Sequence, residues 1–217
     1  MLVMSEHIQF TPTTKIWQKG QDIDNKILAI VGVDAYGENI NLCFIAKQLR
    51  QKTKKLIGIF PKAVWQIIKE SQIFDECYPF EYAEAINADY VMDILSLAQL
   101  LNIQVSGEPY LYANQDKVTL WQKRLESLND KKKIGIAWQG AKNRKGDDVR
   151  SASLTDFLPI IQNYPDYYFI SLQKDLGAKE YHLPDGVIYD PMDEVVDFAD
   201  CAALIANIDL IISTDTS

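Results

Sequence analysis

Short apolar runs alternate with segments whose apolar residues recur at helical spacing, and this alternation most restricts the possible folds. Continuous apolar runs are typical of buried strands, and the helical spacing is typical of amphipathic helices. The first run, Lys26–Val33 (KILAIVGV), is followed by a helical segment from Ile40 and then by a second run, Leu56–Phe60. Such alternation predicts a parallel sheet with crossover helices. We therefore expect an α/β protein in which these two strands pair.

The same alternation continues to a polar run at Asn129–Lys133, which is the best candidate for a domain boundary. The elements expected before it are helix Lys62–Glu70, strands Phe74–Tyr78 and Ala88–Ile94, a helix or turn at Leu95–Leu101, and amphipathic helix Asp116–Leu128. We predict an N-terminal entry segment over 1–25, in which Trp17 packs on the core. A first Rossmann-like domain with a linker helix follows over 26–130, and a second Rossmann-like domain over 131–217.

The second domain is expected to be incomplete. Its predicted strands are Ile134–Trp138, Tyr167–Leu172, Val187–Tyr189 and Leu210–Ser213, and its predicted helices are Leu154–Asn163 and Asp197–Ala206. A doubly wound sheet normally continues from its last strand into a covering helix, whereas this sequence ends just past that strand. We expect a fragment, or a sheet covered by a partner chain or by a compensating arrangement.

A cationic loop lies between a predicted strand and a predicted helix in the stretch Lys133–Ser151 (KIGIAWQGAKNRKGDDVRS). Ligands of open α/β sheets bind beyond the carboxyl ends of the strands, and a helix N-terminus offers free N–H groups to an anion. The loop after Gly140 supplies the cations Lys142, Arg144, Lys145 and Arg150. We hypothesise that this loop holds a phosphorylated ligand. The alternative is a solvated loop whose charges have no role.

Composition excludes several classes of protein. The chain has 217 residues, 47% of them hydrophobic, and a formal net charge of −8, which argues against a nucleic-acid partner. No apolar stretch approaches the length of a membrane span, and the N-terminus lacks the pattern of a signal peptide. Three scattered cysteines predict reduced thiols in a cytoplasmic protein. Two histidines and no cysteine pair at ligand spacing argue against a metal site.

Several stretches occur in an informative order from about Ile16 to the end of the chain. They are Trp17–Gly20 (WQKG), Gly37–Asn39 (GEN), Leu95–Leu101, Glu108–Leu125, Ile134–Gly140 (IGIAWQG), Arg150–Ser151, Phe169–Lys174 (FISLQK), Asp197–Asp209 (DFADCAALIANID) and Leu210–Thr216 (LIISTDT). Together they resemble the heptosyltransferase-like, family 9-type glycosyltransferases of the two-Rossmann-domain (GT-B) architecture. The bacterial branch that is often fused to tetratricopeptide repeats is the most similar.

This resemblance implies a hexosyl- or heptosyltransferase that moves a sugar from a nucleotide-diphosphate-sugar donor to a hydroxyl acceptor, with no further cofactor. In such folds the donor sits mostly on the second domain and the acceptor mostly on the first. This chain departs from the family twice. The family usually has Gly-Asp where this sequence has Gly37-Glu38, and it continues past the Asp-Thr with a histidine-containing helix start. The second departure implies an incomplete donor site.

Two alternatives remain open. A non-catalytic descendant could bind a nucleotide sugar, or a partner protein, without turnover. A dehydrogenase of the Rossmann type is disfavoured, because VGVDAYG at residues 31–37 lacks the G-x-G-x-x-G spacing.

The resemblance assigns candidate roles to residues on both domains. Glu38, beside Gly37, would be a general base that deprotonates the acceptor hydroxyl. Its alternative role is that of an acidic residue favoured by the helix dipole. Arg150 and Lys174 would face the donor diphosphate, since fixed cations stabilise the charge of the leaving group. Their alternative role is that of ordinary surface cations.

The remaining candidates surround the predicted strand ends of the second domain. Ser151 and Ser153 would cap the helix that starts near Leu154, and phosphate contact is compatible with capping. Gln173 would bond a base or ribose, or be a satisfied strand-end amide. Trp138 fits packing between sheet and helix better than stacking on a base. The set of donor-site candidates is completed by Gly140, Asp215 and Thr216; the last two either meet the ligand or form a frayed end.

Overall fold

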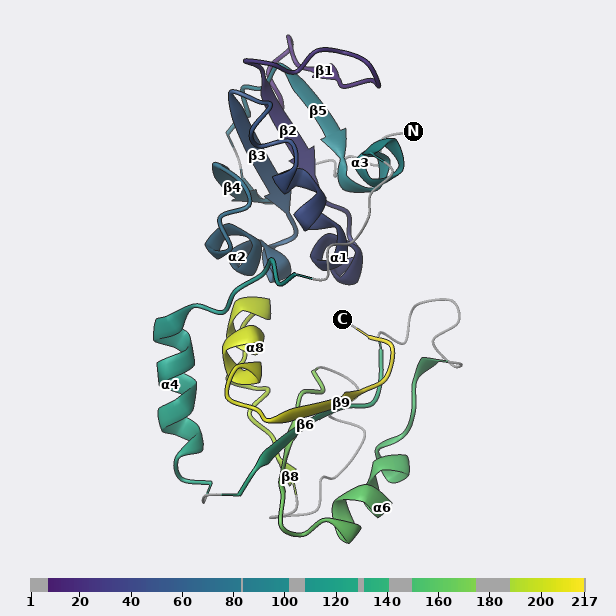
Figure 1. The fold of residues 1–217 in the computed structure, drawn as a ribbon, viewed down its shortest axis with the longest axis vertical. Helices are drawn as coiled ribbons and strands as arrows, with labels where there is room; N and C mark the ends of the chain where they lie inside the picture. Colours follow the sequence, from purple (N-terminus) through teal and green to yellow (C-terminus); the bar gives the residue numbers. More distant parts are fainter. Residues whose placement is uncertain are drawn as a thin grey trace. The chain divides into compact units, whose positions relative to one another are not determined.

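The chain folds into two compact units, each built on its own parallel sheet (Figure 1). The first unit comprises residues 1–112 with 197–199, and the second comprises 113–196 with 200–217. The computed structural model describes residues 8–82, 84–101, 108–128, 131–140, 150–174 and 188–216. The predicted fold class, α/β with two Rossmann-like parallel sheets of the GT-B type, is confirmed.

The first sheet has five strands in the order β1-β5-β2-β3-β4, and every pair is parallel. The elements are β1 (Lys15–Ile16), β2 (Ile27–Val31), α1 (Tyr36–Lys47), β3 (Lys55–Phe60), α2 (Lys62–Glu70), β4 (Glu76–Pro79), β5 (Tyr90–Asp93) and α3 (Ile94–Leu101). The expected pairing of the first two apolar runs is confirmed, with Ile27 opposite Lys55 and Val31 opposite Ile59. Both strands are buried because they lie inside the sheet.

The entry segment differs from the prediction, since part of it belongs to the first sheet. Strand β1 lies beside β5, and the Lys15 and Trp17 N–H groups donate to the carbonyls of Asp89 and Val91, both at 3.0 Å. Trp17 is buried, as its expected packing on the core requires. A two-residue strand is too short to show an alternating pattern, so periodicity does not predict it.

The second sheet has four parallel strands in the order β8-β7-β6-β9. Its elements are α4 (Gln115–Leu125), β6 (Lys133–Ala137), α6 (Leu154–Asn163), β7 (Tyr168–Ser171), β8 (Ile188–Tyr189), α8 (Phe198–Ile205) and β9 (Leu210–Ser213). Helix α6 packs on the face that carries Ile134 and Phe169, whereas α4 and the later part of α8 pack on the face that carries Ile170. The sheet is therefore a layer between helices.

Helix α4 packs with the second unit, whereas the sequence assigned it to the first domain. Trp121 and Leu125 are buried in a cluster with Ile170, Met192, Val195, Ala203 and Leu204. The Lys117 ammonium and the Asp200 carboxylate form an ion pair at 2.7 Å. The division between units thus falls between Tyr112 and Ala113. A polar run marks a loop, but the apolar face of the helix decides which core that helix joins.

Strand β9 lies at the edge of the described sheet, with β6 as its partner. Its apolar residues Leu210 and Ile211 are 53% and 40% exposed. Whether a partner chain or a further segment covers them, as expected of an incomplete domain, stays a prediction.

Candidate functional site

In each parallel sheet the strand order reverses once, because later strands add on the opposite side of the first central strand. In the second unit the chain runs from β6 through α6 to β7 on one side, and β9 later adds on the other side. In the first unit β3 follows β2 on one side, and β5 adds on the other. Ligands of open α/β sheets bind at the carboxyl ends of the strands at such switch points. The candidate sites are therefore the ends of β6 and β9, and the ends of β2 and β5.

Gln173 organises the end of β6. Its Oε1 accepts hydrogen bonds from the backbone N–H groups of Trp138 at 3.1 Å and Gln139 at 2.8 Å. Its Nε2 donates to the Gln139 carbonyl at 3.0 Å. The side chain is buried and bonded to the neighbouring backbone, as a strand-end amide. Gln173 therefore orders the backbone at the end of β6, and its contact with a base or ribose stays a prediction.

Ser151 and Ala152, which follow the cationic loop, are hydrogen-bonded to the end of β6. The Gly140 N–H donates to Ser151 Oγ at 3.1 Å, and the Ala152 N–H donates to the Trp138 carbonyl at 2.7 Å. Ser153, and not Ser151, caps α6 through a capping box with Asp156. Ser151 thus lies at the strand end and outside the helix cap.

Arg150 and Asp215 come together at the switch point of the second unit. The guanidinium Nη1 lies 3.6 Å from Asp215 Oδ2, and the two side chains are 36% and 84% exposed. The Thr214 N–H donates to the Ala137 carbonyl at 3.0 Å, which ties the segment after β9 to the end of β6. Thr216 follows directly, with its N–H bonded to the Thr214 carbonyl at 2.9 Å. The structure therefore gathers Gly140, Arg150, Ser151, Asp215 and Thr216 around neighbouring strand ends.

Two predicted donor contacts are engaged elsewhere. The Lys174 ammonium donates to the backbone carbonyls of Val195 and Met192, so it holds the segment before α8. Trp138 is fully buried and packs with Leu154 and Phe157. The packing expected of Trp138 is confirmed. Contact of either side chain with a donor stays a prediction.

The structure leaves most of the cationic loop undescribed. Lys142, Arg144 and Lys145 lie outside the described residues, so the structure does not place the rest of the cationic loop.

In the part of the chain that is described, no group of three or more His, Cys, Asp or Glu side chains is arranged to hold a metal ion.

The thiols are poor candidates for nucleophiles. Burial raises the pKa of Cys43 to about 12 and that of Cys201 to about 11, and burial also raises the pKa of Cys77. All three cysteines are free, and the thiolate is the reactive form. Nucleophilic chemistry at these sulfurs is therefore disfavoured near neutral pH.

In the first unit, Gly37 and Glu38 lie in the first turn of α1, directly after β2. Both are partly buried. Asp93, at the end of β5, is buried opposite Val31 and accepts a hydrogen bond from the Ser96 N–H at 2.8 Å. The switch point thus carries the carboxylates of Glu38 and Asp93, and Asp93 caps α3.

Asn39 closes the connection from β2 to α1, a role that the sequence analysis missed. Its Oδ1 accepts from the Val33 N–H at 2.9 Å, and its Nδ2 donates to the carbonyls of Val33 at 2.6 Å and Ala35 at 2.9 Å. The residue is fully buried. A Cβ at Gly32 would lie 2.4 Å from Asn39 Oδ1, so the glycine is needed for this close approach. Asn39 therefore positions the helix turn that carries Glu38.

The two switch-point sheets define a protein of two Rossmann-like units. Among solved structures, the chain is similar to a glycosyl transferase family 9 protein from Veillonella parvula DSM 2008. The TM-score is 0.63 at 9% sequence identity, over 89% of this chain and 76% of the other. No family model and no curated protein matches the sequence. At this identity the likeness establishes a shared fold.

No helix among the described residues is both long enough and apolar enough to cross a membrane.

Replacing Asn39 with alanine should lower the free energy of unfolding by about 1–3 kcal/mol, because buried backbone groups lose their partners. Urea denaturation followed by circular dichroism measures this change. Asn41→Ala is the matched control, since Asn41 lies on the same helix and is exposed. Equal stability of the two variants would contradict the role given to Asn39.

Proposed function

We propose that this protein binds a nucleotide-diphosphate sugar and transfers the sugar to a hydroxyl acceptor. The observation that supports this most is Arg150, which lies with Asp215 at the switch point of the second unit. The fold shared with a glycosyl transferase family 9 protein, and the family resemblance of the sequence, point the same way.

The second unit would bind the donor diphosphate. Arginine presents a planar fork of N–H donors that matches phosphate oxygens. As the glycosidic bond breaks, negative charge develops on the leaving diphosphate, so a fixed cation at that place stabilises the transition state. Gly140, Ser151 and Thr216 lie on the neighbouring strand ends and would supply backbone and hydroxyl contacts.

The first unit would supply the base. Glu38 would accept the proton of the acceptor hydroxyl as the oxygen attacks the anomeric carbon. The proton thus passes to a carboxylate, and the electron pair of the breaking bond leaves with the diphosphate. Gly37 would let an acceptor approach the same turn.

The finer parts of the proposal rest on the sequence. The scattered cysteines support action in the cytoplasm, and the net charge of −8 supports independence of nucleic acid. The two histidines and the cysteine spacing support independence of metal ions, and the resemblance supports the branch associated with tetratricopeptide repeats. None of them changes the roles given to Arg150 and Glu38.

A second candidate function is binding of a nucleotide sugar without transfer. It is favoured by the partners that the cations already have, because Arg150 is paired with Asp215 and Lys174 holds backbone carbonyls. A ligand would then replace Asp215 as the partner of Arg150. Binding and turnover assays separate the two functions.

The Arg150→Ala variant should bind uridine diphosphate, or whichever nucleoside diphosphate binds the wild type, at least about tenfold more weakly, or about 1.4 kcal/mol. The reason is the loss of the charged fork toward the phosphates. Isothermal titration calorimetry gives both affinities.

Arg124→Ala serves as the control, because Arg124 belongs to the same unit, is equally exposed and is also in an ion pair, with Glu194 at 3.1 Å. Unchanged affinity in Arg150→Ala, or equal losses in the two variants, would remove Arg150 from the site.

The Glu38→Gln variant should keep donor binding and lose transfer by about 10²–10⁴-fold, which is the usual contribution of a general base. The amide keeps the size of the side chain and cannot accept the proton. Initial rates of nucleoside diphosphate release measure transfer, and Asp34→Asn, an exposed acid in the same connection, is the control. Equal turnover in Glu38→Gln and wild type would exclude the base role, whereas binding without turnover in the wild type would favour the second candidate.

A further inference from the structure

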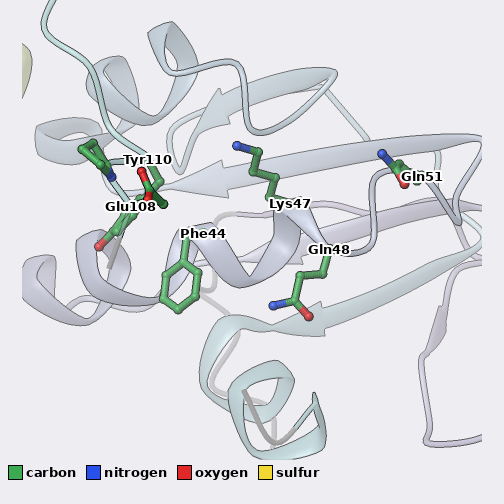
Figure 2. A pocket seen from close by; sticks show the side chains of 7 residues that line it. Phe44, Lys47, Gln48, Gln51, Glu108 and Tyr110 are labelled. Atoms are coloured by element: carbon green, nitrogen blue, oxygen red, sulfur yellow. The ribbon is translucent and has the colours of Figure 1, made fainter. Parts of the chain in front are cut away.

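A hollow on the first unit is lined by residues of α1, of the turn that follows it and of the segment Glu108–Tyr110 (Figure 2). Its volume is about 340 Å³, and it is open to solvent. This volume lies within the range of about 300–1,000 Å³ that is usual for small-molecule sites. Its lining includes Phe44, Lys47, Gln48, Gln51, Glu108 and Tyr110. The chemistry of these side chains indicates what could bind there.

One wall of the hollow is aromatic. The rings of Phe44 and Tyr110 lie with their centroids 5.1 Å apart, at an angle of 43°. The Tyr110 hydroxyl donates to the Ile40 carbonyl at 3.0 Å, and the Tyr112 N–H donates to Ser71 Oγ at 3.0 Å. These bonds hold the 108–112 segment against the first unit. The aromatic wall is therefore formed before any ligand binds, which lowers the entropy cost of binding.

The polar part of the lining carries both signs of charge and two amides. Lys47 and Glu108 contribute opposite charges, so the hollow has little preference for an anion or a cation. Gln48 and Gln51 are exposed, and each amide offers donors and acceptors together. Such a lining fits a neutral ligand that has many groups able both to donate and to accept hydrogen bonds.

Carbohydrates combine these properties. Sugar hydroxyls both donate and accept hydrogen bonds, and the C–H face of a pyranose ring packs against aromatic rings. A free phosphate would lack a dominant cation here, and an apolar ligand would leave the amides and the charges buried without partners. We infer that the hollow lined by Phe44, Gln48 and Tyr110 is a carbohydrate-binding site.

This site is separate from the proposed base. With a rise of about 1.5 Å per residue, Phe44 and Gln48 lie roughly 9 Å and roughly 15 Å along the helix axis from Glu38. Phe44 and Lys47 belong to the last turn of α1, Gln48 is its C-cap, and Gln51 lies in the turn that follows. The site would therefore hold a sugar other than the one being transferred, and its existence does not depend on transfer.

The test uses an array of neutral oligosaccharides, followed by saturation-transfer NMR with the oligosaccharide that gives the strongest signal. The wild type should bind at least one of them. Gln48→Ala and Phe44→Leu should each weaken binding by about fivefold or more, because they remove an amide and a flat ring face. Phe44→Trp should retain binding, since the ring face is kept. Asn41→Ala, on the same helix and outside the hollow, should bind like the wild type.

Several outcomes would overturn the inference. One is an array on which no oligosaccharide is retained by the wild type. Another is equal binding by the wild type and Gln48→Ala, a surface variant that should keep the fold. A third is displacement of the oligosaccharide by uridine diphosphate, which would place the sugar at the strand ends. Failure of the proposed function shows instead in the calorimetry of Arg150→Ala, for donor binding, and in the turnover of Glu38→Gln, for transfer. The two failures are therefore distinguishable.

Discussion

The carboxyl edge of each sheet depends on one buried side-chain amide. In the first unit Asn39 bonds the backbone of Val33 and Ala35, and in the second Gln173 bonds the backbone of Trp138 and Gln139. A parallel strand that ends at a switch point leaves backbone groups beyond its last ladder bond, and buried groups of this kind need partners. An amide can both donate and accept, so one side chain satisfies several of them. The loops that carry the candidate residues are positioned by these two amides.

The hydrogen bonds of Gln173 and Ser151 help to position Arg150 and Asp215 in the second unit. Because Gln173 and Ser151 hold the end of β6, Arg150 lies close to the segment after β9, where Asp215 is its partner. An exposed ion pair of this geometry contributes little to stability, about 0–1 kcal/mol. The pair therefore matters for function more than for stability, because it shows a carboxylate next to the Arg150 guanidinium at the switch point. Exchange of Asp215 for a diphosphate is the step on which donor binding would depend.

Much of the fold could be predicted from local patterns in the sequence. Helices α2 and α6 have the predicted bounds, Lys62–Glu70 and Leu154–Asn163, because apolar periodicity marks their buried faces. Strand β1 was missed because two residues show no period. The placement of α4 was missed because the partners of Trp121 and Leu125 come from later segments of the chain, including Met192.

The candidate site was predictable to a smaller extent. Arg150 and Asp215 follow from the strand–loop–helix order, since strand ends of a parallel sheet gather at one edge. The engagement of Lys174 did not follow, because its acceptors are backbone carbonyls of residues 192 and 195, which carry no sequence signal. The hydrogen bonds that Asn39 makes across the β2–α1 connection have only a weak sequence signal, which is a polar residue at a buried position near the start of a helix. Hydrogen-bond partners made by tertiary packing are thus the part that the sequence leaves open.

The central claim is that the switch point between β6 and β9 receives a diphosphate. Titration of isotope-labelled protein with uridine diphosphate, followed by amide chemical shifts, tests it most directly. We predict the largest shifts at Gln139, Gly140, Ser151 and the residues from Thr214 onward. Shifts confined to the opposite edge of that sheet, at residues 131–133, or to the first unit, would contradict it.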